Sequence, residues 1–233
     1  MTTTTSTPPQ PAAPGRTAPP LATARTTGWL YLGLGVTGML GFLLIRPRVV
    51  GADGASTVEL LTAHETLARV GVVAYLGTVV TQVLVALWFF RLFRRTDAFV
   101  ASTLTTFGLF NASVVLASAA ASATALDLTP LGPQAAGEVH ALTTLAENLW
   151  GVGAVFFGLW LLPMGMLALR VGMPRPLGWV LLVGGGGYVV SSVLGYLLPD
   201  AALAAALLTV PATVGEFWMI GYLLHGGVFR RAA

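Results

Sequence analysis

The stretch LARVGVVAYLGTVVTQVLVALWFF, residues Leu67–Phe90, decides the fold class of this chain. It has 24 residues and contains a single charge, that of Arg69. A bilayer core is about 30 Å thick, and about 20 helical residues cross it. Three arginines, Arg91, Arg94 and Arg95, follow directly. The stretch therefore predicts a transmembrane helix with a basic end.

Five more apolar stretches of spanning length occur on either side of this one. The whole chain of 233 residues is 55% hydrophobic and only 9% charged, whereas soluble domains are about 25% charged. Strands of a membrane barrel would be shorter and about half polar. We therefore predict an all-α integral membrane protein, a bundle of six transmembrane helices. The other five spans are expected at about Thr27–Ile45, Ala98–Leu126, Leu145–Leu169, Leu177–Leu198 and Leu203–Phe229.

Residues 1–24 are rich in Thr, Pro and Ala and contain six prolines. Proline interrupts helices, so we expect a disordered cytoplasmic tail at 1–24 and a transmembrane domain at 25–233. A signal peptide fits less well, because the first apolar stretch begins only at Gly28 and exceeds a usual signal core. The chain has no Cys, which excludes disulfides and thiolate-bound metals.

The arginines predict the orientation. All 12 basic residues are Arg, and the pattern of spans places nine at one side of the membrane and three at the other. Arginine accumulates on the cytoplasmic side, so both termini are expected in the cytoplasm, with the protein in the cytoplasmic membrane. The net charge is only +3, and we expect no nucleic-acid partner. The nine are Arg16, Arg25, Arg91, Arg94, Arg95, Arg170, Arg175, Arg230 and Arg231.

Three ionisable residues fall within the apolar spans: Arg69, Glu147 and Glu216. Such residues are costly in a bilayer and are candidates for function. All three map to the outer half of the bundle, where we expect one polar cluster. A structural Arg69–Glu216 ion pair is the favoured explanation, while Glu65 and Arg69 are also spaced for a pair within one helix.

Other residues on the outer side are possible neighbours of a pocket. These are His64, Glu65, His140 and Pro211. Pro211 precedes Glu216 by five residues, and a proline frees a backbone carbonyl that a ligand can use. His140 and Glu147 share a helix face, but no metal-binding motif surrounds them. We predict no metal and no cofactor.

A set of short motifs resembles one bacterial membrane-protein family, catalogued as domain of unknown function 4386. The resemblance covers about Arg25 to Gly227 and implies a helical bundle of about six spans, with no established reaction. It places Arg69 and Glu216 in the common framework of that family. The motifs are Arg25, Gly28, Tyr31 and Leu32; Arg69-Val70-Gly71; Phe156-Phe157-Gly158-Leu159 and Gly165; Pro174, Pro176, Leu177 and Gly178; Gly187-Tyr188; and Pro199, Pro211 and Glu216.

Three functions remain open at this point. The favoured one is a non-enzymatic bundle with an outer-leaflet-facing pocket for a lipid or small apolar molecule. The first alternative is a small transporter or channel-like carrier that uses Arg69 and Glu216. The second is an intramembrane enzyme that uses His and Glu side chains. Besides the lipid bilayer no partner is predicted, and the oligomeric state stays open.

Overall fold

A computed structural model describes residues 21–227, without the side chain of Pro199. This part of the chain is entirely helical, and six of its helices are long and apolar enough to cross a membrane. The prediction of six spans is confirmed at this level. The helices are α1 (Leu21–Gly38) with its continuations η1 (Met39–Ile45) and α2 (Arg46–Val49), α3 (Gly54–Ala63), α4 (Glu65–Phe93), α5 (Ala98–Asp127), η2 (Thr129–Ala135), α6 (Ala136–Val171), α7 (Arg175–Leu197), η3 (Pro199–Ala201) and α8 (Ala202–His225).

Helix α1 begins at Leu21, so the last four residues of the predicted tail, 21–24, are helical. The correction has a packing reason, because Ala24 is fully buried and Leu21 packs against the same core. Residues 1–20 of the predicted tail lie outside the described residues, as do 228–233 at the end of the predicted sixth span.

Local sequence explains three of the helix ends. Asp53 and Ser56 form a capping box at the start of α3, and the Asp97 side chain accepts a hydrogen bond from the backbone N–H of Val100 at the start of α5. Each bond satisfies an N–H group that a helix leaves unpaired. Gly172 ends α6 at a positive φ of 86°, a conformation that glycine adopts without strain.

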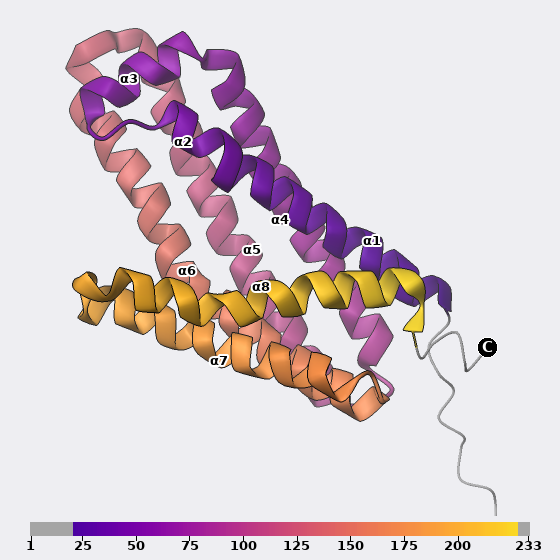
Figure 1. The fold of residues 1–233 in the computed structure, drawn as a ribbon. Coiled ribbons are helices and arrows are strands. Elements are labelled where there is room, and N and C mark those ends of the chain that lie inside the picture. Colours follow the sequence, from indigo (N-terminus) through magenta and orange to yellow (C-terminus); the bar gives the residue numbers. More distant parts are fainter. Residues whose placement is uncertain (1–20, 228–233) are drawn as a thin grey trace, which may run out of the picture.

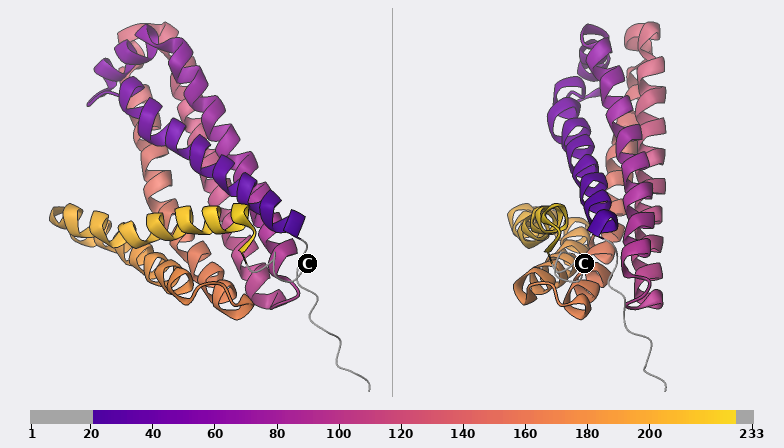
Figure 2. Two further views of the ribbon diagram at one scale, coloured as in Figure 1. Left: turned by 45° about the vertical axis from the view of Figure 1, so that its right-hand side comes forward. Right: turned by 90° about the vertical axis from the view of Figure 1, so that its right-hand side faces the viewer.

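The helices form two groups that diverge from a common end. Helices α1, α4, α5 and α6 run side by side, while α7 and α8 form a hairpin that crosses them at a steep angle (Figures 1 and 2). Helix α7 packs on α6, and α8 packs on α7 and α1. The start of α1 and the end of α8 therefore lie together, and the closed end of the hairpin stands away from the other four helices (Figure 1).

Glycines set this arrangement by letting backbones touch. A Cβ at Gly158 of α6 would lie 2.8 Å from the carbonyl oxygen of Gly185 in α7, and one at Gly165 would lie 2.8 Å from that of Gly178. Small residues at such crossings allow close van der Waals packing in membranes. The run Gly184–Gly187 continues an unbroken α7, with Gly184 against the backbone of Ala212 in α8. Gly185 and Gly187 also meet backbone atoms of neighbouring helices, whereas a Cβ at Gly186 would meet nothing within 4 Å.

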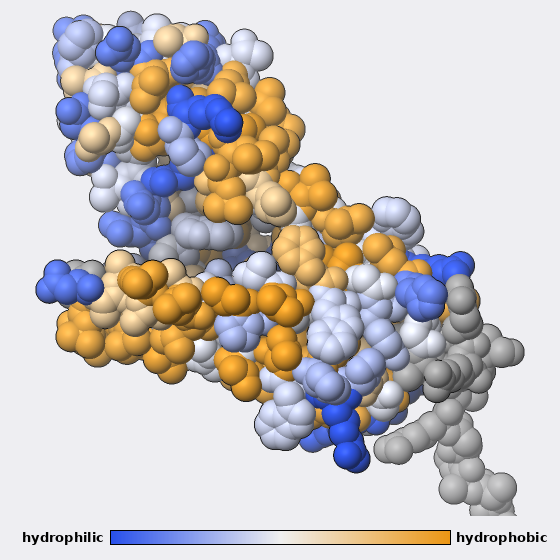
Figure 3. Space-filling model, in the orientation of Figure 1, coloured by the Kyte–Doolittle hydropathy of each residue, from blue (hydrophilic) through white to orange (hydrophobic). Residues whose placement is uncertain are grey.

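The surface outside these contacts is strongly apolar. Apolar side chains cover the hairpin, and hydrophilic ones gather at the far end of the molecule near α2 and α3 (Figure 3). On α8, Leu203, Leu207 and Phe217 are each more than half exposed. In water such a surface would be costly, so its extent supports contact with lipid chains.

Candidate functional site

A large cavity lies where the α7–α8 hairpin diverges from the other helices. Its volume is about 430 Å³, and its lining comes from α1, η1, α4, α5, α6, α7 and α8. The rim reaches the surface, since Met39, Leu43 and Phe217 are 45, 67 and 53% exposed. In Figure 3 the surface is indented where the hairpin meets the rest of the molecule. We refer to this space as the hairpin cavity.

The deep end of the hairpin cavity carries a buried phenol–carboxyl pair. The Tyr31 hydroxyl donates a hydrogen bond of 2.5 Å to Oε1 of Glu216. Tyr31 is 2% exposed, and Glu216 is half-buried with its exposed part lining the cavity. This contact joins α1 to α8 across 185 positions of sequence. It places one ionisable group inside the apolar bundle with a neutral partner.

An aromatic cluster fixes the position of Tyr31. Its ring meets those of Phe89 and Trp160 edge to face, with centroids 5.6 and 5.9 Å apart. Edge-to-face pairs add about 0.5–1.5 kcal/mol beyond the area they bury. Trp160 is 1% exposed, and its indole N–H makes no hydrogen bond of ordinary geometry within the described residues. The aromatic cluster therefore holds the Tyr31 hydroxyl in a fixed position for its hydrogen bond to Glu216.

Two amides complete the polar part of the wall. Asn111 of α5 donates a hydrogen bond of 3.3 Å from its Nδ2 to Oε1 of Gln82 in α4. Both side chains are buried, at 6 and 1% exposure, and both line the hairpin cavity together with Thr78. Polar side chains at this depth join helices and offer hydrogen bonds to a ligand.

The π-helical segment η1 shapes the outer part of the cavity. It places Phe42 against Trp150 of α6, with ring centroids 3.6 Å apart, and against Tyr75 of α4, at 4.4 Å. Single π-helical turns are rare and occur frequently at functional sites. The cavity extends along α1 and η1 from Tyr31 to Leu43, about 18 Å at 1.5 Å per residue.

Arg46 and Glu147 form an ion pair one helical turn beyond this aromatic rim. The Nη2 of Arg46 lies 3.0 Å from Oε2 of Glu147, and the two side chains are 26 and 65% exposed. Because the pair is partly solvated, its contribution to stability is small, about 0–1 kcal/mol.

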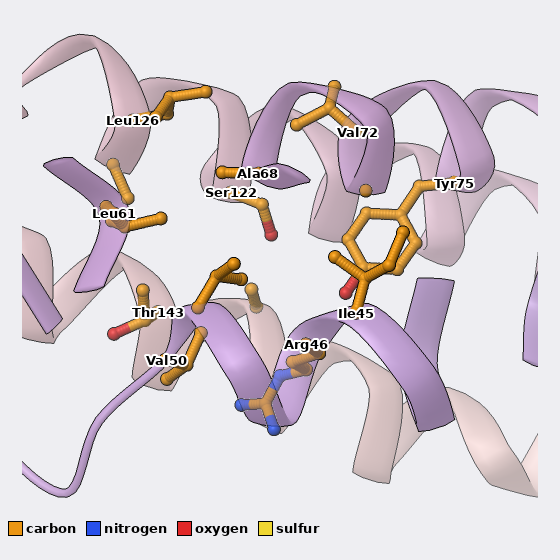
Figure 4. A pocket seen from close by; sticks show the side chains of 14 residues that line it. Ile45, Arg46, Val50, Leu61, Ala68, Val72, Tyr75, Ser122, Leu126 and Thr143 are labelled. Carbon is orange, nitrogen blue, oxygen red and sulfur yellow. The ribbon is translucent and has the colours of Figure 1, made fainter. Parts of the chain in front are cut away.

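A second, much smaller cavity lies behind that ion pair. Its volume is about 40 Å³, and a water molecule needs about 10–15 Å³, so it has room for only a few waters. Side chains of Ser122, Thr143 and Tyr75 surround it among apolar neighbours, and the Arg46 guanidinium points away from its centre (Figure 4). This cavity is too small for an organic ligand.

The three predicted cluster residues have three different partners. Arg69 pairs with Glu65 at 2.6 Å, both more than half exposed, Glu147 pairs with Arg46, and Glu216 bonds to Tyr31. Within residues 21–227 no ion pair or hydrogen bond joins any two of the three. The expected Arg69–Glu216 pair is therefore corrected to two separate contacts. The physical reason for this difference is that Glu65 lies one turn from Arg69 on the same helix, at the spacing that favours an ion pair.

The remaining predicted neighbours lie away from the hairpin cavity. His64 lies at the junction of α3 and α4, and His140 lies on α6 next to Gly54 of α3. Pro211 is in α8 and packs over Gly184, outside the cavity lining. The described residues hold no group of three His, Cys, Asp or Glu side chains that could bind a metal ion.

Gln82 and Asn111 were not among the site residues predicted from the sequence. Both are amides in the middle of apolar stretches, and this polarity was a usable signal. Tyr31 was named only among the family motifs, and its role as a partner of Glu216 had no local signal, because an aromatic residue is ordinary in a membrane helix.

Comparison with known proteins adds one result. The family described as "Domain of unknown function (DUF4386)" matches residues 26–227 of the 233-residue chain. Comparisons with curated proteins and with solved structures give no match.

Proposed function

Because this chain belongs to the DUF4386 family, whose description assigns no activity, we propose a function from the site itself: the hairpin cavity binds a lipid or a small apolar molecule, without catalysis. The observation that carries the proposal is the cavity of about 430 Å³ with the Tyr31–Glu216 pair at its deep end. This cavity supports the expectation of a ligand pocket, and its lining contains Glu216 but not Arg69.

Size and chemistry both fit a ligand. Binding pockets for small molecules measure about 300–1,000 Å³ and combine apolar walls with a few convergent polar groups. Here the walls are leucines, glycines, a methionine, an isoleucine and aromatic rings. The polar groups include the side chains of Tyr31, Glu216, Gln82, Asn111, Thr78 and Thr213. A ligand with an apolar body and one polar end would satisfy both parts of the wall.

We infer that the cavity opens toward the outer leaflet. The arginine distribution favours cytoplasmic termini, and the helix ends that carry Arg91, Arg94, Arg170 and Arg175 lie at the end of the bundle where α1 begins. The exposed rim at Leu43 lies toward the opposite end of α1. With this orientation a lipid or apolar molecule enters sideways between α1 and the hairpin.

A pair of glycine substitutions tests the binding proposal. Gly35 lines the hairpin cavity and Gly221 lies outside its lining, and a Cβ at either meets nothing within 4 Å. Gly35→Leu therefore fills part of the cavity, and Gly221→Leu is its matched control. Native mass spectrometry of protein taken from the membrane in lipid nanodiscs is expected to show a co-purified mass. The mass should persist in wild type and Gly221→Leu and be lost in Gly35→Leu. Retention in Gly35→Leu, or no bound mass in any form, overturns the proposal.

The orientation has its own test, because the chain has no native Cys. Glu59 in α3 and Arg94 after α4 are both exposed, and each is replaced in turn by a single cysteine. A membrane-impermeant maleimide added to intact cells is expected to label Glu59→Cys and to spare Arg94→Cys until the cells are opened. The reverse pattern refutes cytoplasmic termini.

A further inference from the structure

The charge of the hairpin cavity is unbalanced. Among the described residues that line the cavity, Glu216 is the only Asp or Glu, and none is Arg, Lys or His. Arg46, the arginine nearest along α1 and η1, lines the small cavity instead and pairs with Glu147. The cavity therefore holds an acid without a basic partner.

An unpaired acid in an apolar site is costly. Burying an ionised carboxylate without a counter-charge costs far more than burying a neutral polar group, and ionisable side chains within membranes normally pair with each other. Tyr31 supplies one hydrogen bond to Oε1 but no positive charge. Part of the Glu216 side chain faces the open volume, where a ligand can approach it.

The rest of the lining suits a positive charge on an organic body. Aromatic faces attract ammonium groups that lie within about 6 Å of the ring centre. Phe157 and Tyr188 stand with ring centroids 5.3 Å apart on α6 and α7. Phe42 and Trp150 stack nearer the rim, too far from Glu216 to meet the same charge, and suit an apolar body. Six aromatic residues line the cavity in all, namely Tyr31, Phe42, Trp150, Phe157, Tyr188 and Phe217. A bare metal ion would gain little from such walls.

We propose that the ligand of the hairpin cavity is an apolar organic cation, an amine or quaternary ammonium whose charged end lies at Glu216. Its apolar body extends along α1 toward Phe42 and Trp150. This inference rests on the proposed binding function and specifies the chemical class of the ligand.

The test compares two ligands of the same shape. Benzyltrimethylammonium and neopentylbenzene differ only by a charged nitrogen in place of a carbon. Each is titrated by calorimetry into wild-type protein in nanodiscs of zwitterionic lipid, with empty nanodiscs subtracted. The variants are Glu216→Gln and, as a matched control, Glu59→Gln, which removes an exposed carboxylate of α3 far outside the cavity lining.

Wild type and Glu59→Gln are expected to bind the cation at least about tenfold more tightly than its uncharged isostere. In Glu216→Gln the preference is expected to disappear, while the isostere keeps its affinity. Glu216→Asp retains the charge and should retain the preference, which separates loss of charge from misfolding.

Each failure has a distinct meaning. Equal binding of both ligands by wild type overturns the cation inference and leaves the binding function in place. A cation preference that survives in Glu216→Gln overturns it as well. If neither ligand binds wild type and Gly35→Leu changes no co-purified mass, the binding function itself fails.

Discussion

The bond between Tyr31 and Glu216 gives a quantitative prediction about the stability of the bundle. Tyr31→Phe removes the hydroxyl and leaves the Glu216 carboxyl without its donor. Glu216→Met removes the acceptor and keeps an apolar side chain of similar length. Because an unsatisfied buried group costs more than an apolar replacement of both partners, the double variant is expected to be more stable than the sum of the two single changes predicts.

The expected coupling follows from the geometry of the pair. The bond is 2.5 Å long and Tyr31 is 2% exposed, which favours a strong contribution of about 1.5–3 kcal/mol for a bond to a charged group. Double-mutant cycles within membranes give less, about 0.6 kcal/mol on average and about 1.7 at most. Since Glu216 also faces a cavity that water can enter, we expect a coupling of about 1 kcal/mol.

The assay is reversible unfolding in mixed micelles with rising SDS content, followed by far-ultraviolet circular dichroism, for wild type, both single variants and the double variant. A matched cycle on Glu65 and Arg69, whose side chains are 55 and 63% exposed, should give no more than about 0.5 kcal/mol. If the Tyr31–Glu216 coupling is below about 0.3 kcal/mol, it is within the error of simple additivity, and the argument that this bond joins α1 to α8 is refuted.

Two further predictions concern helix packing and a helix cap. Gly184→Ala would force a methyl group into the backbone of Ala212 and is expected to destabilise the protein by about 1–3 kcal/mol in the same unfolding assay. Gly186→Ala, on the same helix with nothing within 4 Å, should be neutral or stabilising by up to about 1 kcal/mol, and equal losses in both would contradict the packing. The hydrogen bond from the backbone N–H of Val100 lowers the pKa of the Asp97 carboxyl from its ordinary 3.8, and the charge of Arg170 lowers it further. The stabilisation by this cap is therefore complete above pH 3.8 and is lost as the pH falls through the lower pKa of the folded state. Asp97→Asn should therefore flatten the fall in stability on acidification below about pH 4; an unchanged slope would count against the cap.

Features that depend on residues close together in the sequence were predicted, whereas features that depend on residues far apart in the sequence were not. Span positions are local, because about 20 apolar residues in sequence suffice to cross a bilayer, and so the ends of α5 at Ala98 and of α7 at Leu197 fall within a residue of prediction. The pair of Glu65 and Arg69 is local as well, and its spacing alone predicts the observed bond.

The partners of Glu147 and Glu216 depend on which helices are neighbours. Arg46 is 101 positions from Glu147, and Tyr31 is 185 positions from Glu216. Span hydropathy carries no information about this adjacency. It is set by contacts such as that of Gly28 in α1 with Leu224 in α8, which no periodicity in a single sequence reveals. The cavity follows from the steep crossing of the hairpin and was therefore expected only in outline.

The glycine contacts between α6 and α7 are the point about which the hairpin would rotate relative to the other helices. Gly185 is the last residue of α7 whose backbone touches a glycine of α6, although the Tyr196 hydroxyl also reaches Gly151. Beyond Gly185, α7 continues for 12 residues to Leu197, about 18 Å at 1.5 Å per residue. A rotation of α7 by about 10° about Gly185 would displace Leu197, at the closed end of the hairpin, by about 3 Å. It would displace Tyr188, three residues from Gly185, by less than about 1 Å. Such a rotation would therefore move the closed end of the hairpin much further than the part of α7 that lines the cavity at Tyr188.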